Sequence, residues 1–219
     1  MRLHIELDNL DSTTAFGRAL ASVLKAGDAL ALEGDLGAGK TTLARAIAEA
    51  RGVDPGLVSS PTYVIANEYP PAREGEPPVV HVDAYRLTSV EDLDALGWDR
   101  LADGSSILLV EWPERIAGAL PRESTATLRL RATGESARAV ELDFPEHWES
   151  REALAPLREL ALPARTPTTC PVTGRHVPAD APSWPFVSEQ ARMADLYKWF
   201  SGQHEISRPL DQRDLDEVE

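Results

Sequence analysis

The residue types needed for phosphate chemistry are concentrated in Gly34-Asp-Leu-Gly-Ala-Gly-Lys-Thr-Thr42, which fits the pattern G-x-x-x-x-G-K-[ST]. Glycines let a backbone bend so that successive N–H groups face an anion, and a following helix adds the positive end of its dipole. In such a loop Lys40 would reach the β- and γ-phosphates, and the Thr41 hydroxyl would ligate Mg²⁺. The spacing of these residues therefore predicts a site for a nucleoside triphosphate.

The elements that flank this loop have the order that phosphate binding requires. Residues 28–33 form a short apolar run of strand length, and residues 42–51 show helical periodicity that ends at Gly52. The apolar stripe of this helix consists of Leu43, Ala46, Ile47 and Ala50. A strand, a glycine loop and a helix in this order favour a phosphate loop over an ordinary glycine-rich turn.

Two later apolar runs each end in a carboxylate. The run Val79–Asp83 ends in Asp83, and the run Ser106–Glu111 ends in Glu111. Ligands of open α/β sheets bind beside the carboxyl ends of the strands. The two acids therefore match a metal ligand and a water-positioning acid beside a triphosphate.

A third candidate segment is Ser60-Pro61-Thr62. Pro61 favours an extended chain, which leaves the hydroxyls of Ser60 and Thr62 free to meet a phosphate or its metal. A solvated turn is the alternative interpretation of the same residues.

Composition limits the class of protein. The 219 residues suit one α/β domain plus an appendage, and a net charge of −14 disfavours a general nucleic-acid backbone binder. That charge leaves open an action on RNA through a partner. The single cysteine, Cys170, excludes an internal disulfide framework and a Cys-only zinc site. No apolar run reaches membrane-spanning length and the first residues have a strand pattern, so we expect a cytoplasmic enzyme without a membrane contact.

Further patterns complete the predicted fold. Residues 2–8 alternate like a half-buried strand, Ser12 is predicted to cap a helix that reaches about Lys25, and residues 125–131 and 138–144 predict an antiparallel hairpin at one edge of the sheet. The fold class is therefore α/β: a three-layer P-loop NTPase with a mostly parallel central sheet, an antiparallel C-terminal hairpin and a small, mostly irregular or helical tail. We expect the ATPase domain over 1–146, a helix and Pro/Thr-rich linker over 147–168, and a tail over 169–219.

Four motifs in this order closely resemble the TsaE (YjeE) family, the small ATPases of bacterial tRNA threonylcarbamoyladenosine synthesis. They are Gly34-Asp-Leu-Gly-Ala-Gly-Lys-Thr-Thr42, Ser60-Pro-Thr-Tyr63, His81-Val-Asp-Ala-Tyr-Arg-Leu87 and Glu111-Trp-Pro-Glu114. The resemblance extends from the first strand to about Phe144. A minor departure is Ala84, where the family commonly has a bulkier apolar residue.

The resemblance implies a role for each of the matching residues. The phosphates would be held by Gly37, Ala38, Gly39, Lys40, Thr41 and Thr42, and Leu10 would lie near the adenine. Thr41 and Glu111 would be the protein ligands of Mg²⁺, while Asp83 would orient or deprotonate the attacking water. Ser60, Pro61 and Thr62 would form a switch-like loop that senses the γ-phosphate. Trp112 would be a site wall, a partner contact or a buried structural aromatic.

The same resemblance implies a reaction and partners. The chain would hydrolyse ATP to ADP and phosphate without transferring the threonylcarbamoyl group. It would work with TsaD, which modifies adenosine 37 of tRNA, and with TsaB, and it would meet tRNA only through TsaD. Hydrolysis would reset that complex between turnovers.

The tail resembles a second family, the YacG zinc ribbons, through Cys170-Pro-Val-Thr-Gly-Arg175 and the segment 184–200. The four cysteines of that family fall at Cys170, Thr173, Val187 and Ala191, so three are missing, and we expect no zinc. The helix expected around 189–200 keeps an apolar face that could contact another protein. We expect the acidic end, 209–219, to be disordered.

Two alternatives remain open, another small P-loop enzyme such as a kinase and a non-catalytic binding module, whereas a GTPase is disfavoured. A nucleotide or metabolite kinase should carry an acceptor site and an Arg-bearing lid, and no clear lid lies between Arg115 and Phe144. A GTPase needs an Asn-Lys-x-Asp motif, which the chain lacks. A non-catalytic, nucleotide-gated binding module would not need Thr41, Asp83 and Glu111 together, so these three residues favour turnover.

Overall fold

The computed structural model describes residues 1–58, 66–87, 90–116, 118–162, 166–179, 181 and 183–200. Contacts divide the chain into two compact units, Met1–Leu162 and Pro163–Glu219, and each is described by itself. Among the described helices, none combines the length and the apolar character needed to cross a membrane.

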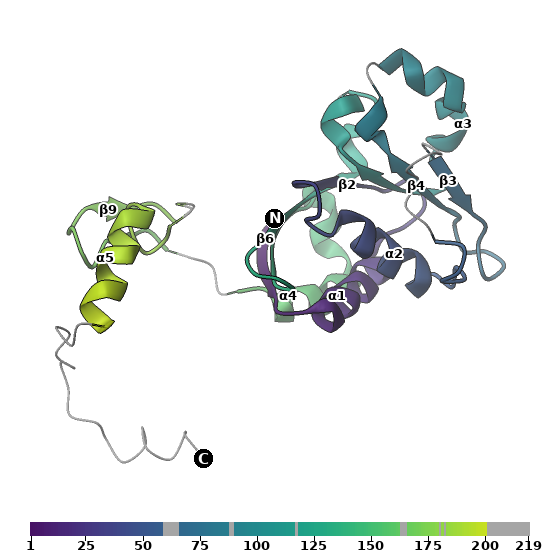
Figure 1. Ribbon diagram of the computed structural model, residues 1–219. Coiled ribbons are helices and arrows are strands. Elements are labelled where there is room, and N and C mark those ends of the chain that lie inside the picture. The colour runs from purple at the N-terminus through teal and green to yellow at the C-terminus, as the bar shows by residue number, and fades with distance from the viewer. Residues whose placement is uncertain are drawn as a thin grey trace, which may run out of the picture. The chain divides into compact units, whose positions relative to one another are not determined.

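A seven-stranded sheet forms the centre of the first unit (Figure 1). Its strands are β1 (Arg2–Leu7), β2 (Ala29–Glu33), β3 (Ala66–Tyr69), β4 (Val79–Asp83), β5 (Ile107–Glu111), β6 (Thr125–Ala132) and β7 (Arg138–Asp143). They lie in the order β1-β7-β6-β2-β5-β4-β3. β2 pairs in parallel with both β5 and β6, and β4 pairs in parallel with β5. The predicted mostly parallel sheet with an antiparallel hairpin is confirmed.

Helices cover both faces of the sheet (Figure 1). The α-helices of this unit are α1 (Leu10–Val23), α2 (Lys40–Ala50), α3 (Trp98–Leu101) and α4 (Ala155–Leu160). Successive strand residues point to opposite faces, so Ile107 and Leu109 pack in the cluster that contains α1 and α2 residues. Leu108 and Val110 pack in a second cluster with Trp98 of α3. Strand residues buried on both sides explain the continuous apolar runs in the sequence.

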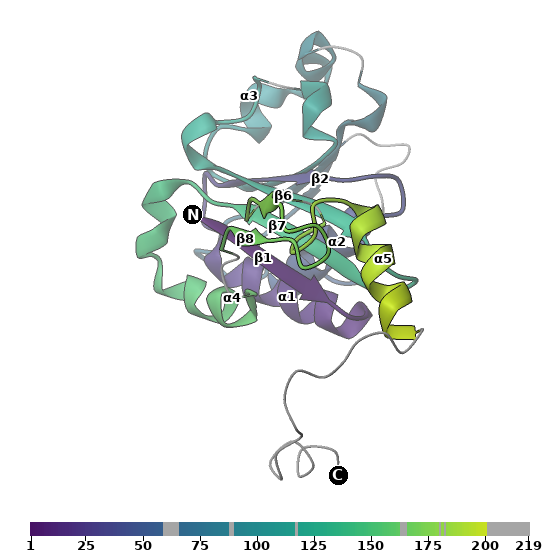
Figure 2. The same cartoon turned by 90° about the vertical axis from the view of Figure 1, so that its left-hand side faces the viewer.

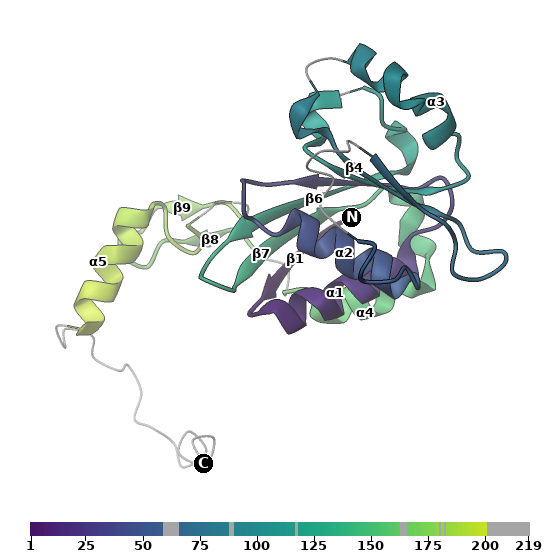
Figure 3. The same cartoon turned by 45° about the vertical axis from the view of Figure 1, so that its right-hand side comes forward.

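Helices α1 and α2 pack closely on each other (Figure 3). A Cβ atom at Gly17 of α1 would lie only 2.6 Å from Cβ of Ala46 in α2, so the contact requires a glycine. α1 begins earlier than predicted because Asn9, and not Ser12, is its N-cap. Oδ1 of Asn9 accepts the Ser12 N–H at 2.9 Å, and Oγ of Ser12 accepts the Asn9 N–H at 3.1 Å.

The hairpin of β6 and β7 occupies an internal position in the sheet. β6 joins β2, while β1 pairs antiparallel with β7 and forms the edge (Figure 2). The first strand of the chain, β1, is therefore the edge strand next to β7, although the β6–β7 hairpin comes late in the sequence. This order brings the start of β7 beside the phosphate loop.

Residues 147–162 pack against the rest of the first unit. Trp148, Leu154 and Leu157 are fully buried in the same cluster as α1. Arg151 pairs with Asp28 at 3.0 Å, which ties this segment to the start of β2. The compact unit therefore extends to Leu162, beyond the end at 146 expected from sequence patterns.

The described part of the second unit contains a short hairpin and one helix. Its elements are β8 (Thr168–Thr169), β9 (His176–Val177) and α5 (Glu189–Phe200). Cys170, Val177 and Ala191 form its small buried core. Met193, Leu196 and Tyr197 of α5 are exposed. The acidic end, 209–219, lies outside the described residues.

Candidate functional site

The phosphate loop connects the carboxyl end of β2 to the N-terminus of α2. Gly34, Gly37 and Gly39 have φ values of +141°, +79° and +107°, which glycine adopts at least cost. Gly39 is the N-cap of α2 and supplies no capping side chain. The first amide groups of α2 thus have no side-chain cap and face the end where an anion would bind.

Gly34→Ala should destabilise the protein more than Gly37→Ala. A Cβ at Gly34 would lie 2.4 Å from the carbonyl oxygen of Leu130, whereas a Cβ at Gly37 would meet no atom within 4 Å. Both positions have positive φ, but +141° at Gly34 lies farther from the left-handed region than +79° at Gly37. The clash and this added backbone strain should together make the difference, about 1–3 kcal/mol in the free energy of unfolding. Urea unfolding without nucleotide measures it, and equal losses would contradict the tight approach of β6 to the loop.

Lys40 is buried, with only 5% of its surface exposed. Its Nζ donates to the carbonyl oxygens of Gly34 at 2.7 Å and Asp35 at 2.9 Å, and lies 3.8 Å from the centroid of the Trp112 ring. Burial lowers the pKa of Lys40, and Glu111 and Asp83 oppose that shift. The ammonium group is thus held at the loop by weak carbonyl partners that a phosphate can replace.

Glu111, at the end of β5, links the phosphate-loop helix α2 to strand β4 through two hydrogen bonds. Thr41, the second residue of α2, donates from Oγ1 to Oε2 of Glu111 at 3.1 Å. Oε1 of Glu111 lies 2.9 Å from Nε2 of His81. Glu111 and His81 are 3% and 1% exposed. The structure therefore brings together Thr41 and Glu111, the two predicted Mg²⁺ ligands.

Asp83 ends β4 directly beside Glu111, because the two residues are aligned in the parallel pairing of β4 and β5. Its Oδ1 accepts the Tyr85 N–H at 3.1 Å. Asp83 thereby caps a short 3-10 helix, Ala84–Arg86. Burial raises the pKa of Asp83, and the charge of Glu111 adds to that shift. A carboxylate with a raised pKa is a better proton acceptor than an ordinary aspartate.

Trp112 forms a wall of the site. It has a left-handed backbone conformation, with φ of +57°, which costs a non-glycine residue about 1–2 kcal/mol. Its ring lies over Lys40 and contacts the Tyr85 ring, with 5.0 Å between centroids. Trp112 was expected to be a site wall, a partner contact or a buried structural aromatic. Its contact with Lys40 agrees with a site wall.

A small cavity of about 140 Å³ adjoins the loop. It is lined by Leu10, Thr13, Ala38, Gly39, Thr42, Leu130, Ser136 and Arg138. Leu10, 61% exposed at the start of α1, thus lies beside the loop residues with which it was predicted to share a ligand. The adenine contact itself stays a prediction.

Two residues of this region were not predicted from the sequence. Arg138 begins β7 and donates from Nε to the carbonyl oxygen of Ala38 at 2.7 Å. This contact depends on the order of the strands in the sheet, which no local sequence pattern reveals. His81 is a polar residue in the middle of a buried strand, and that was a signal available in the sequence. The predicted switch residues Ser60, Pro61 and Thr62 lie outside the described residues.

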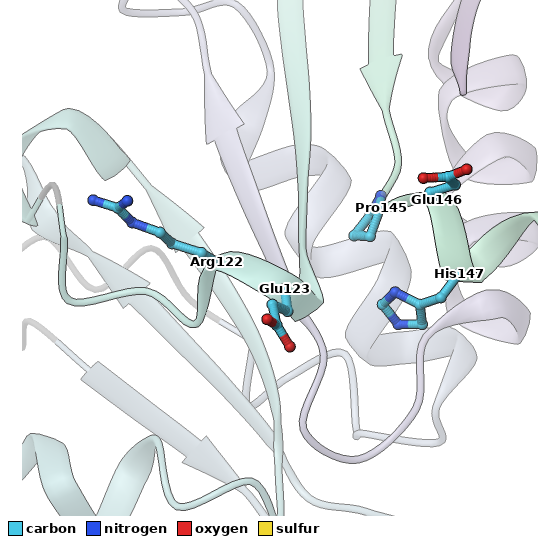
Figure 4. Close-up of a pocket in the computed structure, with 5 residues that line it drawn as sticks. All are labelled: Arg122, Glu123, Pro145, Glu146 and His147. Carbon is cyan, nitrogen blue, oxygen red and sulfur yellow. The ribbon is translucent and has the colours of Figure 1, made fainter.

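A larger open hollow, about 580 Å³, lies where β6 begins and β7 ends (Figure 4). Because β6 runs parallel to β2, this is the end of the sheet opposite the phosphate loop. It is lined by Arg122, Glu123, Pro145, Glu146 and His147, which precede β6 and follow β7. None of the predicted site residues that the structure describes lines it. Those residues lie at the phosphate-loop end.

In the second unit, the four positions equivalent to zinc-ribbon cysteines lie near one another. Burial raises the pKa of the Cys170 thiol, but hydrogen bonds from the Thr173 hydroxyl and from backbone groups of Val187, Thr173 and Val172 lower it to about 7. Val187 packs on the small core that contains Cys170 and Ala191. Within the described part of the chain, no three His, Cys, Asp or Glu side chains are grouped to hold a metal. That zinc is not bound stays a prediction.

Comparisons with known proteins agree on one family. A family model described as threonylcarbamoyl adenosine biosynthesis protein TsaE matches residues 7–140. A Streptomyces coelicolor protein named tRNA threonylcarbamoyladenosine biosynthesis protein TsaE is 46% identical over 125 residues, which cover 55% of this chain and 80% of that protein. A Bacillus subtilis protein of the same name is 41% identical over 115 residues, or 52% and 69% of the two chains. The crystal structure of Bacillus subtilis YdiB superimposes with a TM-score of 0.56 at 30% identity and covers 73% of this chain and 95% of that one.

Proposed function

Because the chain belongs to the TsaE family, we propose that it is the Mg²⁺-dependent ATPase of tRNA N6-threonylcarbamoyladenosine biosynthesis. It hydrolyses ATP to ADP and phosphate with TsaB and TsaD in the cytoplasm, resets the transferase, and meets tRNA only through TsaD. The observation that carries the proposal is the convergence of Thr41, Glu111 and Asp83 beside the phosphate loop.

The oxygen atoms of Thr41 and Glu111 fit a magnesium site. Mg²⁺ prefers hard oxygen ligands about 2.0–2.1 Å away in octahedral geometry, so adjacent ligands lie roughly 3 Å apart. Oγ1 of Thr41 and Oε2 of Glu111 are separated by 3.1 Å. The ion would neutralise charge on the phosphates, and two protein ligands suffice because Mg²⁺ takes the others from water and phosphate.

The other residues divide the remaining work. Lys40 exchanges its carbonyl partners for phosphate oxygens, and the α2 amides bind the same anion. Asp83, whose pKa burial raises, accepts a proton from or orients the attacking water. The net charge of −14 is consistent with a chain that leaves contact with RNA to its partners.

An ATPase assay with and without TsaB–TsaD tests the proposal. We expect Mg²⁺-dependent release of phosphate that increases when the partners are added. Glu111→Gln should abolish the Mg²⁺-dependent part, because an amide is a poorer ligand for the ion. Binding without turnover in the complete complex would instead identify a nucleotide-gated binding module, and turnover that ignores the partners would favour a different small P-loop enzyme.

A further inference from the structure

We infer that His81 is a positioning residue that holds Glu111 in the orientation needed for the metal. The inference depends on the proposed function, which assigns Glu111 to Mg²⁺. It concerns a side chain that contacts Glu111 and to which the proposed function assigns no role in binding nucleotide or metal.

Three side chains form a continuous chain of hydrogen bonds across the site. Thr41 bonds to Oε2 of Glu111 at 3.1 Å, and His81 bonds to Oε1 at 2.9 Å. His81 is aligned with Leu109 on β5, so it lies two residue pairs before Glu111 and on the same face of the sheet. A carboxylate bonded at both oxygens cannot rotate freely, which keeps Oε2 directed to Thr41.

The geometry also selects one form of the imidazole. A carboxylate only accepts hydrogen bonds, so the proton lies on Nε2 of His81. The other ring nitrogen, Nδ1, is buried and has no hydrogen-bond partner among the described residues. A proton carried by Nδ1 in place of Nε2 would be buried without an acceptor and would leave Glu111 without its donor, so Nε2–H donates the bond to Glu111.

Packing alone does not explain a histidine at this position. The same face of β4 carries Val79, and the neighbouring position on β5 is Leu109; both are buried in the apolar core. An apolar side chain would fill the space without leaving a buried nitrogen unpaired. What the histidine adds is its bond to Glu111.

Two variants separate positioning from packing. In His81→Gln the amide nitrogen can take the place of Nε2, whereas in His81→Asn it falls near Nδ1 and cannot reach Glu111. Calorimetry of AMPPNP binding, with Mg²⁺ varied or removed by EDTA, measures the effect. We expect His81→Asn to raise the half-saturating Mg²⁺ concentration by about 10- to 100-fold. His81→Gln should stay close to wild type, and Mg²⁺-free affinity should be unchanged in both.

A spectroscopic measurement on the wild-type full chain needs no variant. With ¹⁵N-labelled histidine, NMR should show, among the five imidazoles, one hydrogen-bonded Nε2–H signal that disappears in His81→Asn. An Nε2 of His81 that carries no proton, or equal Mg²⁺ dependence in His81→Asn and wild type, would overturn this inference alone. If both variants lose the same affinity for AMPPNP without Mg²⁺, His81 has only a structural role and the inference is wrong. Wild-type nucleotide binding that ignores Mg²⁺ would instead overturn the proposed function.

Discussion

Asp83→Asn is expected to lower ATP hydrolysis in the presence of TsaB–TsaD by about 100- to 10,000-fold, the usual contribution of a general acid or base. Asparagine has nearly the same shape and can still accept the Tyr85 N–H through its amide oxygen. It cannot accept a proton from water. Nucleotide affinity should therefore remain close to wild type while the rate of phosphate release falls.

The control for this variant is Asp99→Asn. Asp99 is exposed in the first turn of α3, so its substitution removes one negative charge without touching the site. We expect wild-type turnover from the control. Single-turnover measurements separate the chemical step from product release. Full turnover in Asp83→Asn would remove Asp83 from the mechanism.

Lys40→Ala is expected to weaken ATP binding by roughly 10- to 150-fold, because a hydrogen bond to a charged group contributes about 1.5–3 kcal/mol. Lys40 is the only cationic residue in 34–42. The buried ammonium group also balances Glu111 and Asp83, the two carboxylates whose charges raise its pKa most. Its loss therefore leaves phosphate charge opposite acidic groups without compensation.

Calorimetry with Lys25→Ala as the matched control checks this result. Lys25 is exposed just after α1, so the variant makes the same change in net charge away from the loop. A decrease in affinity confined to Lys40→Ala would locate the effect at the loop. Unchanged affinity in Lys40→Ala would overturn the assignment of 34–42 as a phosphate loop.

The local parts of the site were predictable because each depends on one short segment. The glycines, the lysine and the threonine of 34–42 form a complete pattern within nine consecutive positions. Periodicity likewise predicted α2 and the apolar strands that end at Asp83 and Glu111, since one buried face imposes its own repeat. The predicted cap of α1 was wrong, because asparagine and serine are both good N-cap residues and the sequence pattern does not choose between Asn9 and Ser12. In the structure Asn9 is the N-cap, and Ser12 returns a hydrogen bond to it.

The contacts between distant segments depended on strand order and register, which residue patterns do not encode. Thr41 meets Glu111 across 70 positions, and Arg138 reaches Ala38 across 100, because β5 and β6 flank β2. The role of His81 could not be read from its strand, since it depends on which neighbour lies beside β4. Side-chain proximity across a sheet is a property of the pairing, and burial of the whole core selects that pairing.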